Sequence, residues 1–264
     1  MSETRVVNKY LNNVNYKDCI GKVCKSKSSG DFKIVKYNDA RNVEIQFLKT
    51  GFETVVELGS IKIGKVKDPY SPSVFGVGVV GTKYLASVNG GNTKEYLLWQ
   101  GVLQRCCSDD FKKKQQTYKD CEVSKNFKSY EYFYEWCHKQ IGFGNEGWQL
   151  DKDLLVKGNK VYSEDTCVFI PQEVNTLLIK SVASRGKHLI GVSWSNTSRS
   201  FIARVAKNKG KQEYLGSFNT EIEAFNAYKT AKESFVKEQA NEWKDQIDPR
   251  AYEALMNYTV EITD

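Results

Sequence analysis

Residues 188–231 alternate apolar and polar side chains in three short runs and then change to a helical spacing, and this change of period restricts the fold more than any other feature of the chain. The runs HLIGVSWSN, SFIARVAKN and KQEYLGSFN are separated by turn-forming residues, which predicts three antiparallel strands. Thr220, followed three residues later by Glu223, is a capping-box pattern that predicts a helix start. We therefore expect a three-stranded sheet with one helix packed on it.

Cations are concentrated in the same part of the chain. Residues 185–232 hold nine Lys and Arg against three Glu, a net charge of +6, whereas the whole chain of 264 residues carries +7. Because side chains alternate between the two faces of a strand, Arg204 is expected on a face that the helix does not cover. A basic, uncovered sheet face is typical of nucleic-acid binding, and the alternative is that these charges only solvate an exposed sheet. Most of the excess positive charge of the chain is therefore expected here.

The run GVSWSNTSRSFIARVAKNKGKQEYLGSFNTEIEAFNAYKTA resembles the DNA-binding domain of the Apetala and ethylene-response-factor family, over about residues 186–236. The resemblance implies that the sheet, and not the helix, lies in the major groove of double-stranded DNA. The matching elements are Gly191-Val192, Trp194, Arg199 with Phe201, Ala203-Arg204, Tyr214-Leu215-Gly216, Phe218 and the run from Glu221 to Ala224. Arginine can pair with guanine edges, and lysines in a turn can contact phosphates. The expected DNA-binding residues are Trp194, Arg199, Arg204, Lys207, Lys209 and Lys211.

The central run WQLDKDLLVKGNKVYSEDTCVFIPQEVN resembles the hairpin-plus-helix core of HNH endonucleases, within a match from about Glu95 to Leu178. The resemblance implies a histidine that activates water, a divalent metal, and an asparagine that holds the histidine in place. In this sequence Lys152 stands where the catalytic histidine is expected, and Asn159 matches the central asparagine. Mg²⁺ is the expected cofactor only of an active enzyme. The positions that match metal ligands are Asp151, Asp165 and Asn175.

The lysine at the position of the general base weighs against catalysis. Lysine side chains are protonated at neutral pH and do not accept a proton from water. The chain has two histidines, His138 and His188, and neither lies in the hairpin. Lys152 could instead hold a phosphate, and a purely structural alternative is that Asp151 and Asn159 make turn hydrogen bonds. The enzyme class is left open, with impaired or lost cleavage as the expectation.

The N-terminal part of the chain has a strand pattern. Apolar residues alternate at Val43, Ile45 and Phe47 and again at Ile61 and Ile63, which is typical of half-buried antiparallel strands. We expect a small β-barrel-like module here. Its basic and aromatic residues predict a nucleic-acid surface, with a protein-binding role as the alternative. These residues are Lys33, Lys36, Arg41, Lys62, Lys65 and Lys67 with Tyr37 and Phe47.

Composition and motif order complete the expected organisation. The chain is 40% hydrophobic and 12% aromatic with 4 Pro, which excludes a disordered protein. The chain has no stretch of about 20 uninterrupted apolar residues, the length that spans a membrane. Seven cysteines without a CxxC pair favour reduced thiols in a cytoplasm. The expected class is α+β, with a β-rich module at 1–90, an HNH-like ββα core among helices at 91–182, an Apetala-type domain at 183–240 and a helical tail at 241–264.

The arrangement of an N-terminal sheet module, an HNH-like core and an Apetala-like domain is typical of phage-encoded homing endonucleases. The sequence therefore predicts a phage-type protein that binds double-stranded DNA, with impaired or lost cleavage. One alternative is an active DNA endonuclease that depends on a divalent metal. A second alternative is a phage counter-defence inhibitor that binds a host protein. In each case we expect the protein in the cytoplasm of the host cell, with no membrane partner.

Overall fold

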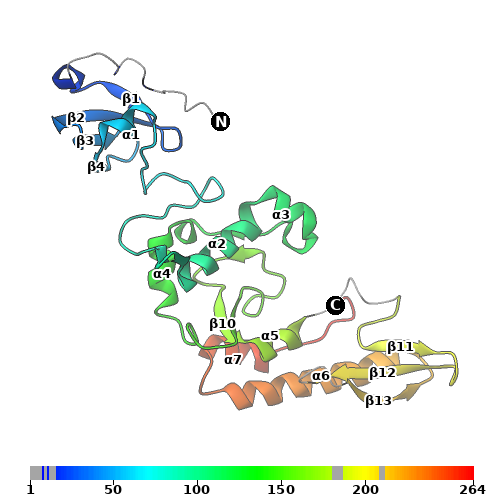
Figure 1. The fold of residues 1–264 in the computed structure, drawn as a ribbon. Coiled ribbons are helices and arrows are strands. Elements are labelled where there is room, and N and C mark those ends of the chain that lie inside the picture. The colour runs from blue at the N-terminus through cyan, green and yellow to red at the C-terminus, as the bar shows by residue number, and fades with distance from the viewer. Residues whose placement is uncertain (1–7, 9–10, 12–15, 180–186, 208–211) are drawn as a thin grey trace. The chain divides into compact units, whose positions relative to one another are not determined.

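The computed structural model describes residues 8, 11, 16–179, 187–207 and 212–264 (Figure 1). The chain divides into two compact units, Met1–Glu135 and Trp136–Asp264. Within the described residues, the chain forms a four-stranded antiparallel sheet, a three-stranded antiparallel sheet and seven α-helices. This confirms the α+β class, and the bounds of the four expected domains stay predictions. None of the described helices is both long enough and apolar enough to cross a membrane.

Four consecutive strands form an open antiparallel sheet in the first unit. They are β1 (Val23–Lys25), β2 (Asp31–Asp39), β3 (Asn42–Phe47) and β4 (Glu53–Val56). Among the described residues the sheet runs in the order β1-β2-β3-β4, so its closure into a barrel is not confirmed. Phe47 on β3 is only 1% exposed, and its ring centroid lies 5.5 Å from that of Phe32. The expectation that Phe47 belongs to a binding surface is therefore wrong, because alternation turns it into the core.

The expected strand alternation at Ile61 and Ile63 is also wrong. The chain forms a short helix there, α1 (Leu58–Lys62). Leu58 and Ile61 are three residues apart and both buried in the core of the sheet, a spacing that places them on one face of a helix. The buried Asn8 holds this helix, because its Nδ2 donates to the backbone oxygen of Ile61 at 2.6 Å.

The remainder of the first unit is mainly helical. Helix α2 (Lys94–Cys107) begins after Thr93, whose hydroxyl accepts a hydrogen bond from Tyr96 N. Trp99 on α2 is fully buried, and its Nε1 donates to Phe127 O at 2.8 Å. The basic segment that follows α2 starts with a helix. The other elements are α3 (Asp109–Lys114), α4 (Tyr130–Cys137), η2 (Tyr16–Cys19), β5 (Ser87–Val88), β6 (Gly91–Asn92), η3 (Gln116–Tyr118), β7 (Glu122–Val123) and η4 (Asn126–Lys128).

The C-terminal sheet and helix predicted from the change of period are present in the second unit. Strands β11 (Val192–Ser195), β12 (Ser200–Ala206) and β13 (Gln212–Phe218) pair antiparallel in that order. Helix α6 (Glu221–Trp243) begins with the expected capping box, formed by Thr220 and Glu223. Figure 1 shows α6 running along the sheet and continuing well beyond it. Its first half packs on the sheet in an apolar cluster that includes Val192, Ala203, Val205, Ala224, Phe225 and Tyr228.

A strand pair followed by a helix forms the central core, as expected. Strand β8 (Trp148–Asp151) pairs antiparallel with β10 (Val168–Pro171), and α5 (Gln172–Leu178) follows β10 directly. The short strand β9 (Val161–Tyr162) lies in the long connection between β8 and β10. The second half of α6 and the last helix, α7 (Pro249–Met256), cover this core. The shared apolar cluster includes Val168, Ile170, Val174, Val236, Ala240, Ile247, Ala251 and Leu255.

Candidate functional site

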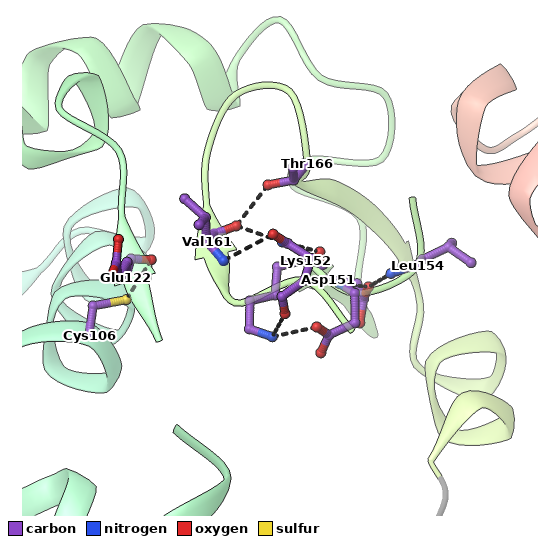
Figure 2. Close-up of polar contacts among 9 residues, drawn as sticks. Cys106, Glu122, Asp151, Lys152, Leu154, Val161 and Thr166 are labelled. Atoms are coloured by element: carbon purple, nitrogen blue, oxygen red, sulfur yellow. Dashed lines mark hydrogen bonds and ion pairs between the residues drawn. The ribbon is translucent and has the colours of Figure 1, made fainter. Parts of the chain in front are cut away.

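Lys152 lies in the connection between β8 and β9 and is almost completely buried, with 6% of its surface exposed. Its Nζ donates to Asp153 Oδ1 at 2.5 Å and to Asn159 O at 3.0 Å. The same nitrogen lies 5.7 Å from the centre of the Tyr162 ring. Figure 2 shows Lys152 close to Asp151 and Val161 in this connection. The ammonium group therefore joins the two ends of the connection and faces the inside of the loop.

The side chain of Asn159 is also bonded within the loop. Its Nδ2 donates to Lys152 O and to Val161 O, both at 2.7 Å, and its Oδ1 accepts from Val161 N at 3.1 Å. Thr166 Oγ1 adds a bond to Val161 O at 2.8 Å (Figure 2). Both amide hydrogens of Asn159 are used, so the group has no donor left with which to hold a catalytic base. The geometry is that of a loop closed by an asparagine side chain.

Asp151, at the end of β8, caps the turn that follows it. Its Oδ1 accepts hydrogen bonds from Asp153 N at 2.8 Å and from Leu154 N at 2.7 Å (Figure 2). Burial raises the pKa of Asp151, and the two backbone N–H groups oppose that rise. One carboxylate oxygen is therefore occupied by the backbone of its own turn.

The three positions that match metal ligands make separate contacts. Asn175 Nδ2 donates to Gln149 Oε1 at 2.8 Å, and the exposed Asp165 accepts from Arg250 Nη1 through its backbone oxygen at 3.4 Å. In the described part of the chain, no three His, Cys, Asp or Glu side chains gather closely enough to hold a metal ion. The buried ammonium of Lys152 beside Asp151 adds a positive charge where a Mg²⁺ ion would need oxygen ligands. The residues present do not fit a Mg²⁺ site.

The histidines and the buried thiol of the core do not supply the missing base. The His138 ring packs edge-on against Phe143, with centroids 5.0 Å apart, and His188 Nδ1 lies 3.1 Å from Glu221 Oε1, outside the hairpin. Burial raises the pKa of Cys167 to about 12, so its thiol stays protonated at neutral pH. The core therefore lacks a neutral base at the position that the HNH resemblance requires.

One face of the C-terminal sheet is left uncovered by α6. Strand alternation places Arg204 on it, and Arg204 Nη1 donates to Ser193 Oγ at 3.3 Å. The Arg204 guanidinium also lies 6.0 Å from the centre of the Tyr214 ring, a residue that is 58% exposed. We call this the outer sheet face. Its residues are Ser193, Ser195, Ser200, Ile202, Arg204, Ala206, Gln212, Tyr214 and Ser217.

The structure separates the residues predicted to bind DNA. Trp194 pairs with Phe201, and the two rings pack edge-on at 4.9 Å, so Trp194 lies on the helix side of the sheet and not beside Arg204. Arg199 lies in the exposed turn before β12 with a φ of 52°. Lys207 Nζ forms an ion pair with Glu213 at 2.6 Å, and the hydrogen bond to Glu213 raises the pKa of Lys207. Lys209 and Lys211 lie outside the described residues.

Sequence reasoning missed the hydroxyl groups that surround Arg204. Tyr214 was matched as part of a motif but was not assigned to the site, because a bulge between Ala203 and Arg204 shifts the register and turns Tyr214 outward. Ser193 and Ser217 follow from simple alternation on β11 and β13. The outer sheet face thus carries one guanidinium among several hydroxyl groups, all of which can hydrogen-bond to base edges or phosphates.

The net charge of each compact unit adds to the count along the chain. Residues 233–264 hold eight Asp and Glu against three Lys and Arg, which offsets the positive stretch that precedes them. The whole second unit has 17 cations and 17 acids, whereas the first unit has 22 cations against 15 acids. Residues 185–232 keep their net charge of +6, but acids elsewhere in the second unit offset it, so that by unit the excess of +7 belongs to the first unit.

Comparisons with known proteins add no relative. No protein-family model matches the chain, and no curated protein or solved structure matches it either.

Proposed function

We propose that the protein binds double-stranded DNA through the outer sheet face and does not cleave it. The proposal keeps the relation to phage HNH homing endonucleases that the sequence motifs suggest. The observation that carries it is the arrangement of Arg204, Ser193 and Tyr214 on a sheet face that α6 leaves exposed. An exposed guanidinium held by a neighbouring hydroxyl can present two parallel N–H groups to a guanine edge.

The central core supports binding without cleavage. The lysine at the base position is bonded inside its loop, and the asparagine that would hold a base has used both amide hydrogens. A general base must reach a water molecule and accept its proton, and neither side chain does so. We infer that the core serves as a rigid support next to the Apetala-like module, with which it shares α6.

Base reading by Arg204 is tested by selection from a random duplex library. The wild type is expected to enrich a short motif, and Arg204→Ala is expected to lose a guanine preference at one position and to bind the enriched duplex about 10-fold to 100-fold more weakly. Sequencing of the bound pool and a gel-shift titration of the enriched duplex measure the two effects. Lys237→Ala is the matched control, because Lys237 is an exposed cation on the far half of α6.

Three results decide this test. Enrichment that survives Arg204→Ala unchanged would show that the outer sheet face does not read bases. Failure of the wild type to enrich any motif would overturn sequence-specific binding altogether. A loss of affinity by Lys237→Ala equal to that of Arg204→Ala would reduce the effect to general electrostatic attraction.

Absence of cleavage is tested on supercoiled plasmid with Mg²⁺ and, separately, Mn²⁺. The wild type is expected to leave the plasmid intact, and so is Lys152→His, because Asn159 remains bonded to the loop backbone and cannot orient the new imidazole. The assay follows conversion of supercoiled to open-circular plasmid on a gel. Metal-dependent nicking by the wild type that disappears in Asp151→Ala would establish an active endonuclease and contradict the proposal.

A further inference from the structure

A group of lysines lies on the first unit, whereas the sheet that the proposed function uses belongs to the second unit. Residues 19–30 and 58–67 together contain six Lys and no Asp or Glu. Four of these lysines are exposed and alternate with buried neighbours, and we call them the lysine surface. They are Lys25, Lys27, Lys65 and Lys67.

Backbone and side-chain bonds hold the two lysine-bearing segments side by side. Lys27 N donates to Gly64 O at 3.0 Å, and the buried Ser26 hydroxyl donates to Val66 O at 2.6 Å. Figure 1 shows β1 and α1, which belong to these two segments, close together in the N-terminal part. Ser26 and Val66 are both buried, whereas the lysines on either side of them are exposed on the two adjacent segments.

Acidic side chains offset little of the positive charge of the lysine surface. In the described part of the chain, none of its four ammonium groups is held in an ion pair or a side-chain hydrogen bond. Asp31 stands opposite Lys25 across the β1-β2 pair and is the closest acid in register. Asp68 follows Lys67 but is buried, and its carboxylate accepts from Thr50 Oγ1 at 2.6 Å. Like charges gathered on one surface repel each other, and an anionic partner removes that cost.

The chemistry of the lysine surface favours phosphates over an acidic protein. Every cation in the two segments is Lys, a point charge on a flexible stem that contacts phosphate without a fixed geometry. Protein interfaces are depleted in Lys and enriched in Arg and aromatic residues. The first unit also carries the whole excess charge of the chain. We propose that the lysine surface binds the phosphate backbone of nucleic acid independently of base sequence, as a second contact that does not rest on the outer sheet face.

Salt dependence of binding tests this proposal in the full chain. The probe is a duplex of about 30 base pairs with mixed sequence, titrated over a series of salt concentrations. Replacement of Lys25, Lys27, Lys65 and Lys67 by Gln is expected to weaken binding at least about tenfold at the lowest salt and to reduce the slope of log K against log salt by about 3 to 4. Because all four side chains are exposed, the variant should fold, and circular dichroism checks this.

A control with the same change of charge separates a local site from net charge. It replaces four exposed lysines elsewhere, Lys113, Lys119, Lys139 and Lys237, by Gln and is expected to change the slope by less than about 1. Equal effects of the two variants would overturn the proposal. An unchanged slope in the lysine-surface variant would also overturn the proposal, even if that variant bound phosphatidylserine vesicles or polyglutamate more weakly than the wild type.

The two nucleic-acid contacts fail in different ways. If the lysine-surface variant has a smaller slope of log K against log salt and still enriches the motif, the lysine surface is supported and the role of the outer sheet face is intact. If Arg204→Ala loses motif enrichment and its slope of log K against log salt is unchanged, only the role of the outer sheet face is affected. A single-stranded probe of the same length, compared with the duplex, shows which form of the backbone the lysine surface prefers.

Discussion

Replacing Gly191 by alanine is expected to lower the free energy of unfolding of the second unit by about 3 kcal/mol or more. Gly191 precedes β11 with a φ of 77°, a conformation that L-residues other than glycine adopt at a cost of about 1 to 2 kcal/mol. A Cβ at this position would lie 2.0 Å from Cδ2 of the Tyr228 ring on α6. Tyr228 is buried, so the ring can give way only by moving the helix from the sheet. Urea unfolding followed by circular dichroism measures the loss.

Gly158→Ala is the matched control for Gly191→Ala. Gly158 has nearly the same φ, 78°, and nothing lies within 4 Å of a Cβ built there. This variant should cost only the backbone strain, about 1 kcal/mol after the gain from a less flexible unfolded chain. Equal losses in the two variants would show that the close approach of Gly191 to Tyr228 carries no energy. A smaller loss in Gly191→Ala than in the control would contradict the packing described for this module.

The fold of the C-terminal module could be predicted because its signals are local. Strand alternation and the Thr220–Glu223 capping box both act over a few neighbouring residues, and both are present in the structure. The N-terminal sheet followed from the same alternation. The strand prediction was wrong at Ile61 and Ile63. There the helical spacing of three between Leu58 and Ile61 competes with the strand spacing of two, and the helix forms. Short segments carry too few apolar positions to separate the two periods.

The candidate site was harder to predict because it depends on contacts between segments. The sequence places Lys152 at the position of a base, but its burial follows from Asn159 and Tyr162, which approach it only after the connection folds back. The face on which Tyr214 lies depends on a single bulge, and the only local signal of that bulge is Gly216 inside the strand, with a φ of 143°. Trp194 matched a motif on the sheet, yet pairing with Phe201 turns it toward the helix side. Motifs identified the elements and could not fix the direction of these side chains.

Burial along α6 shows the same limit within one helix. The apolar face read from the sequence ends at Ala231, whereas the buried face of the helix continues through Lys232, Phe235 and Val236 to Ala240. A helical period carries the face through position 232 even though a lysine stands there. Lys232 is 6% exposed, and burial lowers its pKa to about 8. The helix therefore buries an amine between its contacts with the sheet and with the central core.

Replacing Lys232 by methionine is expected to raise the free energy of unfolding by about 3 kcal/mol at pH 7. Below pH 8 the amine is protonated in both the folded and the unfolded chain, so the folded chain bears the full cost of a buried charge. Between pH 8 and the ordinary pKa of 10.5, the folded chain has released the proton and the unfolded chain has kept it. Wild-type stability should therefore rise with pH in this interval, because the unfolded state binds more protons.

The gain from Lys232→Met should then shrink to about 1 kcal/mol at pH 10, where the folded wild type no longer holds the charge. Urea unfolding of both proteins at pH 7 and pH 10 measures the difference, and Lys237→Met, at an exposed position on the same helix, should change little at either pH. Methionine fills nearly the same volume with a flexible apolar chain, so the comparison isolates the charge. A gain that stays constant with pH would mean that packing and not the amine is responsible. Destabilisation at pH 7 would mean that the ammonium of Lys232 is compensated in the folded protein.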